Sequence, residues 1–265
     1  MTKTVTDVET SITTTSKRRD IFNYLRAGFP ALWVMTHEEN RAERELADAA
    51  SDDERHHVFV WSVTQGLLCI AAPGSDQDRL KLCQPNLTDP MALLKELLPL
   101  PNPRTTKVPE EALVILRDFH WFLDAADVVR KLRDIVGFYK ATRRTLVFVS
   151  PLSRIPIEME KEVTLVEYPL PTQDEVGVVF DQIVQSVGKE KAGVTDRERM
   201  LESALGLSTF EAEQTFALAL VKHGTLNDDA IMTVQHEKAA IVKKDGIREF
   251  FEAEVSMDDV GGLNE

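Results

Sequence analysis

Apolar residues between Asp20 and Tyr168 form short runs that alternate with segments of helical apolar spacing. The runs predict β-strands at 31–36, 57–63, 112–118, 144–150 and 163–168. The helical spacing predicts helices at 20–27, 38–50, 90–98 and 123–139. Three of the strands (31–36, 112–118 and 144–150) are apolar at nearly every position, which is typical of a sheet covered on both faces. The pattern therefore predicts an α/β fold, a three-layer sandwich around a mostly parallel sheet.

Beyond "PLPTQDE" the pattern is helical only, and a hydroxyl residue repeatedly precedes an acid by three positions. Such pairs are typical of capping boxes at helix starts, and here they are Thr172 with Glu175, Thr195 with Glu198, Ser208 with Glu211, and a weaker version, Thr225 with Asp228. Glycines suited to helix stops follow at helical lengths: Gly188, Gly206, Gly224 and Gly246. We therefore predict a four-helix unit over 172–246.

Composition limits the partners that the chain can have. Hydrophobic residues make up 43% and charged residues 28%, as in ordinary globular proteins. No apolar run approaches the roughly 20 residues of a membrane span, so we expect no membrane contact. The polar start "MTKTVTDVETSITTTSKRRD" lacks the apolar centre of a signal peptide, so we expect a flexible leader and a cytoplasmic location. A net charge of −13 disfavours a surface for nucleic acid.

Cysteine and histidine usage argues against a metal site. Cys69 and Cys83 have no second pair at metal-ligand spacing, so we interpret them as reduced thiols. His56 and His57 are adjacent, and neighbours on an extended segment point to opposite faces. We therefore predict no bound metal.

Asp118 ends the apolar run of the third strand, where a nucleotide-hydrolysing site would hold a Mg²⁺-organising acid. A phosphate loop would need glycines, a lysine and a hydroxyl residue between a buried strand and a helix. After the first strand, however, the chain reads "HEENRAERELADAA", without glycine or lysine, and Glu38 and Glu39 occupy the helix end that would attract an anion. We predict no conventional phosphate binding by this chain, and hence no bound ATP or Mg²⁺.

Two further motifs are interpreted as structural. "GKEKAGVT" (188–195) has two glycines at phosphate-loop spacing, but Val194 stands at the lysine position and the segment lies between predicted helices. Asp118 and His120 are spaced to face the same side of an extended backbone, yet no nucleophile or second carboxylate accompanies them in a motif. No catalytic residue is predicted.

In order along the chain, the elements resemble an AAA+ ATPase module, an α/β core followed by a helical lid. The segments "LRAGFPALWVMTHEENRA", "LRDFHWFLDAADVVRKLRD", "IPIEMEKEVTLVEYPLP", "ALGLSTFEAEQTFALALV" and "DDVGGL" together most resemble the amino-terminal half of AAA+ ATPases of the plastid hypothetical-reading-frame-forty-six type. Asp118 resembles the Walker B acid and Ser150 the sensor residue of the next strand. The resemblance covers nearly everything from Asp20 to the end.

The sequence also departs from the catalytic pattern of that family. Phe119 replaces the second acid, and "EMEKEV" (158–163) stands where paired arginines would lie. The resemblance thus implies a degenerate module, with ATP and Mg²⁺ belonging to a parent ATPase whose catalytic module would begin near Asp259. The implied organisation is a leader (1–19), a degenerate AAA-like core (20–170), a helical lid (171–250) and a linker (251–265).

Three functional hypotheses remain open from sequence. The first is a non-catalytic module that shapes a ring, commonly a hexamer in this family, receives a protein partner or regulates an adjoining motor. Its partner contacts would lie on the loops 72–78 and 99–111. The second is an irregular nucleotide pocket near Thr36, Asp118 and Ser150, and the third is a free-standing adaptor.

Overall fold

The computed structural model describes residues 21–53, 57–99, 102 and 106–257, with side chains described as far as Lys244. The expected leader (1–19), His56, part of the loop 99–111 and the end of the expected linker lie outside the described residues. The chain divides after Pro169 into two compact units, here called the α/β unit and the helical unit.

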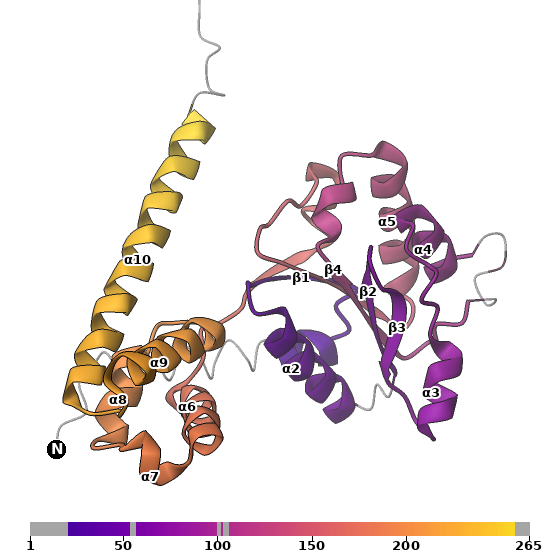
Figure 1. Cartoon of the computed structure of the whole chain (residues 1–265). Coiled ribbons are helices and arrows are strands. Elements are labelled where there is room, and N and C mark those ends of the chain that lie inside the picture. The colour runs from indigo at the N-terminus through magenta and orange to yellow at the C-terminus, as the bar shows by residue number, and fades with distance from the viewer. Residues whose placement is uncertain (1–20, 54–56, 100–101, 103–105, 258–265) are drawn as a thin grey trace, which may run out of the picture. The chain divides into compact units, whose positions relative to one another are not determined.

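The α/β unit contains a six-stranded sheet with the order β3-β2-β4-β5-β1-β6 (Figure 1). Its strands are β1 (Ala31–Met35), β2 (His57–Ser62), β3 (Gly66–Ala71), β4 (Ala112–Arg117), β5 (Thr145–Ser150) and β6 (Thr164–Glu167). All neighbours pair in parallel except β2 and β3. The mostly parallel sheet predicted from sequence is confirmed, and the five predicted strands agree within one or two residues.

Helices cover both faces of the sheet. They are α2 (Glu39–Asp52), α3 (Asp76–Leu82), α4 (Pro90–Leu97) and α5 (Ala126–Tyr139), with short 3₁₀ turns η2 (Phe119–Phe122) and η3 (Ile157–Met159), and residues 21–26 are also helical. Along β4, Leu113 and Ile115 pack in one core with α2, whereas Val114 and Leu116 pack in the other with α4 and α5. The apolar run of β4 thus serves two cores, and the three-layer α/β fold is confirmed.

β3 is a strand that the sequence pattern did not reveal. It forms an antiparallel hairpin with β2, and Val63, predicted as strand, lies in the turn instead. The turn is closed by Gly66, which has φ +67°, and a Cβ there would lie 2.5 Å from the Pro85 carbonyl oxygen. The outer edge of β3 is covered by a short antiparallel bridge from Leu67 to Gln84.

The predicted loop 72–78 is partly helical, because α3 begins within it. Ser75 caps α3 and forms a capping box with Asp78. None of the residues of α3 is buried, so the helix carries no apolar periodicity that the sequence could show.

The helical unit contains five described helices where four were predicted. They are α6 (Gln173–Val187), the one-turn α7 (Lys189–Ala192), α8 (Arg197–Ala204), α9 (Thr209–His223) and α10 (Asp228–Met257). In the core that these helices share, the ring centroids of Phe180 and Phe216 lie 5.2 Å apart. The phosphate-loop-like segment 188–195 lies between α6 and α8, not after a strand.

Two of the four predicted capping boxes are confirmed, at the starts of α6 (Thr172 with Glu175) and α9 (Ser208 with Glu211). The prediction at Thr195 is wrong, because the Asp196 carboxylate accepts the N–H of Arg199 and caps α8 instead. The prediction at Thr225 is also wrong, because Asn227 accepts the N–H of Ala230 before α10. In both places a better acceptor lies nearer the first helical turn.

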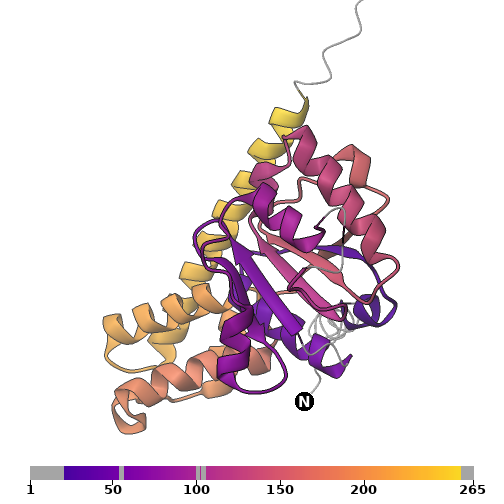
Figure 2. The same cartoon turned by 90° about the vertical axis from the view of Figure 1, so that its right-hand side faces the viewer.

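The predicted stops at Gly188 and Gly224 coincide with the ends of α6 and α9, and Gly206 follows α8 with φ +92°. Gly246 does not end a helix, so that prediction is wrong. α10 continues through it to Met257, and its ribbon is continuous in Figure 2. An interior glycine weakens a helix by about 1 kcal/mol, which does not suffice to end it.

Candidate nucleotide site at the carboxyl edge of the sheet

Thr36, Asp118 and Ser150 lie at the carboxyl ends of β1, β4 and β5, which are neighbours in the sheet. The N–H of Asp118 donates to the carbonyl of Val149 at 3.0 Å, and that of Thr36 donates to the carbonyl of Ser150 at 2.9 Å. The structure therefore brings the three residues to one edge, called here the carboxyl edge. In open α/β sheets this is the side at which ligands bind.

Asp118 adopts a left-handed conformation, with φ +49° and ψ 29°. It is the only non-glycine residue with positive φ in the described part of the chain. A left-handed aspartate is uncommon outside turns, and here the conformation turns β4 sharply into η2. The Asp118 side chain is 49% exposed, so its carboxylate faces solvent beyond the sheet.

His120 does not form a proton-transfer pair with Asp118. Its Nδ1 lies 3.8 Å from Oδ1 of Asp118, beyond hydrogen-bond distance. Burial lowers the pKa of His120 below its ordinary value, outweighing the opposite effect of the carboxylate. Burial thus favours the neutral form of the imidazole, which packs beside Trp121.

Phe119, at the position of the second acid in the Walker B pattern, points into the core. Its ring lies 5.3 Å from Trp61, 5.5 Å from Phe122 and 6.1 Å from Phe148. The backbone turn at Asp118 directs the next side chain inward. This position therefore stabilises the sheet and offers nothing that orients a water molecule.

The two hydroxyl groups of the carboxyl edge are engaged in local contacts. Oγ1 of Thr36 accepts the N–H of Glu38 at 2.9 Å, and Oγ of Ser150 donates to the carbonyl of Leu152 at 2.6 Å. Both residues are buried. Their hydroxyls thus shape the two connections that leave β1 and β5.

The connection from β1 to α2 consists of three residues, from Thr36 to Glu38. Arg41, in the first turn of α2, pairs with Glu38 at 2.9 Å. The Arg41 guanidinium also donates to the carbonyl of Pro169 and lies 4.6 Å from the ring centroid of Tyr168. These contacts fasten the start of α2 to the chain that leaves β6.

A second ion pair joins α2 to the end of β4. Arg117 donates to both carboxylate oxygens of Glu43, at 2.5 and 2.6 Å, and its Nε lies 3.8 Å from Glu39. Burial, and next the Asp118 carboxylate, raise the pKa of Glu39, while Arg117 opposes them. The first turns of α2 thus carry acids held by arginines where a phosphate loop would present amides and a lysine.

The sequence pattern did not predict the Arg117–Glu43 pair. Glu39 and Glu43 are four residues apart and therefore share a face of α2, which was a usable signal. Their partner on β4 is 74 residues away from Glu43, and only the packing of α2 against the sheet brings the two together.

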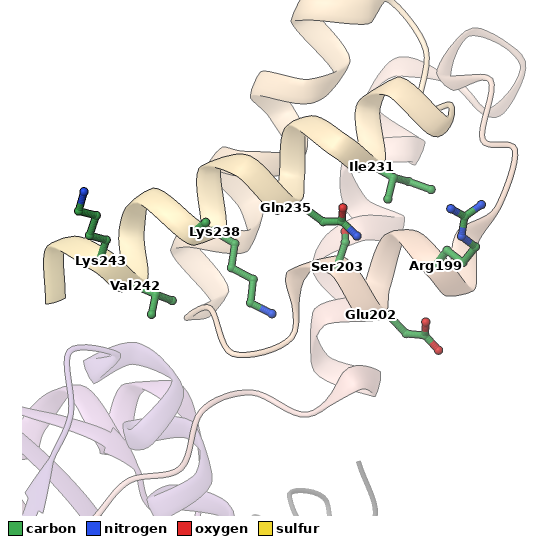
Figure 3. Close-up of a pocket in the computed structure, with 9 residues that line it drawn as sticks. Arg199, Glu202, Ser203, Ile231, Gln235, Lys238, Val242 and Lys243 are labelled. Atoms are coloured by element: carbon green, nitrogen blue, oxygen red, sulfur yellow. The ribbon is translucent and has the colours of Figure 1, made fainter. Parts of the chain in front are cut away.

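The helical unit has an open groove of about 670 Å³ between α8 and α10. Figure 3 shows the side chains that line this groove. The groove combines an apolar wall with three basic residues. Its lining is Arg199, Glu202, Ser203, Ile231, Gln235, Lys238, Ala239, Val242 and Lys243. Arg199 is paired with Asp228 at 3.1 Å at one end. No pattern in the sequence had indicated this groove.

Within the part of the chain that the structure describes, no three His, Cys, Asp or Glu side chains gather as a metal site would require. Among the same residues, no helix combines the length and apolar character needed to cross a bilayer.

A six-stranded, mostly parallel sheet with helices on both faces, followed by a small helical unit that resembles a lid, defines an AAA+ ATPase fold. The chain belongs to the SpoVK-like AAA ATPases. Residues 17–168 match the N-terminal domain of that family and residues 174–245 match its second domain. The resemblance stated from sequence is confirmed.

Similar proteins include AAA domain-containing proteins named ycf46. The protein from Guillardia theta is 24% identical over 247 residues, and the alignment covers 93% of this chain and 46% of the relative. The protein from Trieres chinensis is 21% identical, with 91% and 45% covered. The chain therefore spans less than half the length of these relatives. Among solved structures, PCH-2 of C. elegans aligns with a TM-score of 0.47 at 9% identity, covering 86% of this chain and 68% of that chain.

Proposed function

We propose that this chain is a non-catalytic AAA-like module of a longer AAA ATPase. Its role is to shape a ring, receive a protein partner or regulate an ATP-hydrolysing module elsewhere in the same polypeptide. The observation that carries the proposal is the three-residue connection between β1 and α2. A phosphate loop needs several successive backbone amides that curve around the phosphates, and three residues are too few.

Electrostatics support the same proposal. A helix N-terminus favours an anion by about 0.3–1 kcal/mol. Two like charges about 4 Å apart repel by about 4 kcal/mol at an effective dielectric of about 20. Glu38 and Glu39 oppose an anion at this end of α2. Arg41 pairs with Glu38 and Arg117 lies 3.8 Å from Glu39, so these cations are already held by acids, and no lysine lies in the connection or the first turn of α2.

The competing proposal is an irregular nucleotide pocket at Thr36, Asp118 and Ser150. It is weaker because both hydroxyl groups are engaged in local hydrogen bonds. Asp118 alone retains an exposed polar group, and one carboxylate does not hold Mg²⁺–ATP without a phosphate cradle.

Thermal unfolding with and without 1 mM Mg²⁺–ATP tests the proposal. A site with Kd of about 10 μM would add about 2.7 kcal/mol, or roughly 5–11 °C in Tm. We expect no such shift. A rise of this size that disappears in Asp118→Ala, while Mg²⁺ with adenosine has no effect, would establish the irregular pocket instead.

Assembly and location remain part of the proposal. We expect the longer protein, in the cytoplasm, to form a closed ring through heterologous contacts, and a hexamer is the form implied by the family resemblance. The groove between α8 and α10 is a candidate surface for a protein partner. Light scattering of the longer protein with ATP would measure the subunit number, and a monomer under all nucleotide conditions would contradict the ring.

A further inference from the structure

The two cysteines of the chain lie together at the outer edge of the sheet. Cys69 is in β3, and Cys83 is the residue that ends α3. The N–H of Cys69 donates to Sγ of Cys83 at 3.2 Å, and the same sulfur lies 3.9 Å from the carbonyl oxygen of Cys69. The Cys83 sulfur is thus held beside the backbone of Cys69.

The two thiols differ in their environment. Cys69 is buried and its thiol donates to the carbonyl of Ala71 at 3.2 Å. Burial, and next the Cys83 thiol, raise the pKa of Cys69 to about 11. Cys83 is only partly buried, and it packs against the core that contains Cys69. A small oxidant therefore reaches Cys83 first, with Cys69 as the neighbouring thiol.

We propose that Cys69 and Cys83 are a site of reversible oxidation, at which hydrogen peroxide forms an intramolecular disulfide between them. The sulfur of Cys83 attacks peroxide, which gives a sulfenic acid and releases water. The sulfur of Cys69 then attacks the Cys83 sulfur, the S–O bond breaks, and a second water leaves with the thiol proton. Peroxide is reduced, both cysteines are oxidised, and a dithiol reverses the reaction.

The two cysteines are held close enough for a local side-chain movement to join them in this proposal. The Cys83 sulfur lies within 4 Å of the backbone N and O of Cys69, so the movement that we propose is a rotation of the Cys69 side chain about its Cα–Cβ bond, with loss of its hydrogen bond to Ala71. The neighbouring bridge from Leu67 to Gln84 already holds the two segments side by side. Oxidation would therefore fasten α3 covalently to the edge strand without rearranging the sheet.

The experiment treats the 265-residue chain with hydrogen peroxide and measures its intact mass and its mobility on a non-reducing gel. These are the chain's only cysteines, so thiol loss is assigned without ambiguity. We expect a monomer lighter by about 2 Da that dithiothreitol restores. Trypsin cleaves after Arg79 and Lys81, between the cysteines, so the disulfide would link peptides 56–79 and 82–95.

Single variants test the order of the two steps. In Cys69→Ser, the partly buried Cys83 thiol should stop at the sulfenic acid, about 16 Da heavier and reactive toward dimedone. In the matched variant Cys83→Ser, the buried thiol should stay unmodified. Three results would each overturn the proposal: an unchanged mass of the parent chain, addition of oxygen to it without loss of hydrogen, or disulfide-linked dimers. The parent-chain result stands even where a variant fails to fold.

Discussion

Replacing Arg117 by methionine tests how the start of α2 is held against the sheet. The substitution keeps most of the aliphatic volume but removes the guanidinium that donates twice to Glu43. Only 9% of the Glu43 side chain is exposed, against 23% for Arg117. The variant Arg117→Met therefore leaves a nearly buried carboxylate without its main partner.

The expected loss follows from the burial of the two groups. Breaking a fully buried ion pair costs about 3–5 kcal/mol, whereas exposed pairs are worth about 0–1 kcal/mol. Because Arg117 keeps some access to water, we expect a loss of about 2–4 kcal/mol in the free energy of unfolding. In the double variant Arg117→Met with Glu43→Leu, much of this loss should disappear, because no buried charge remains.

The assay is urea unfolding followed by tryptophan fluorescence. Trp33, Trp61 and Trp121 all lie in the α/β unit, and no tryptophan occurs after Pro169, so the signal reports on that unit alone. The matched control is Arg197→Met, in the helical unit, which breaks an equally bidentate pair with Asp181. Both partners there are at least half exposed, so circular dichroism should show a loss below about 1 kcal/mol.

Two results would refute this reasoning. Equal losses in Arg117→Met and Arg197→Met would show that burial does not set the strength of the pair. Additive losses in the double variant at Arg117 and Glu43 would show that the two side chains are not energetically coupled.

Three further predictions concern the edge, the hairpin and the caps. Burial raises the pKa of Glu39, so the charged carboxylate reduces the free energy of unfolding at pH values above its ordinary pKa of 4.5. Glu39→Gln should therefore be more stable than the parent at pH 7 but not at pH 4. Urea unfolding at the two pH values measures this, and a difference that does not change with pH would contradict it. Gly66→Ala should lower the free energy of unfolding by more than about 2 kcal/mol, because its Cβ would meet the Pro85 carbonyl. The control Gly28→Ala has a similar φ but open space, so it should lose only about 1–2 kcal/mol through left-handed strain. Equal losses in the two variants would exclude the clash. Ser208→Ala should cost the helical unit about 1 kcal/mol and Thr195→Ala far less, measured by circular dichroism, and the reverse order would contradict the observed caps.

The strands of the sheet were predictable because of how they are buried. β1, β4 and β5 are covered on both faces, so nearly every position must be apolar, and this leaves a strong signal. The strand β3 and the helix α3 were missed because they lie at the edge of the sheet, where α3 buries no residue and β3 follows a turn that depends on the conformation of Gly66. At such positions local propensity is weak and tertiary contacts decide.

The candidate site was predictable only in part. The sequence placed Asp118 and Ser150 at strand ends. It could not predict that the Ser150 hydroxyl donates to the carbonyl of Leu152, or that Asp118 adopts a left-handed conformation. The caps show the same limit on a smaller scale, because Thr195 and Asp196 are both acceptable caps by residue type. In the structure Asp196 is the cap, because its carboxylate accepts the N–H of Arg199.

The sequence by itself determined the class of fold, the change from α/β to helical character near Pro169, and the lack of glycine and lysine directly after β1, because periodicity and composition are local properties of the chain. Only the tertiary structure decided which contacts the start of α2 makes. Arg117 reaches Glu43 across 74 residues, Arg41 reaches Pro169 across 128, and Cys83 reaches Cys69 around the end of α3. Such pairs arise from the packing of layers, which no local pattern encodes.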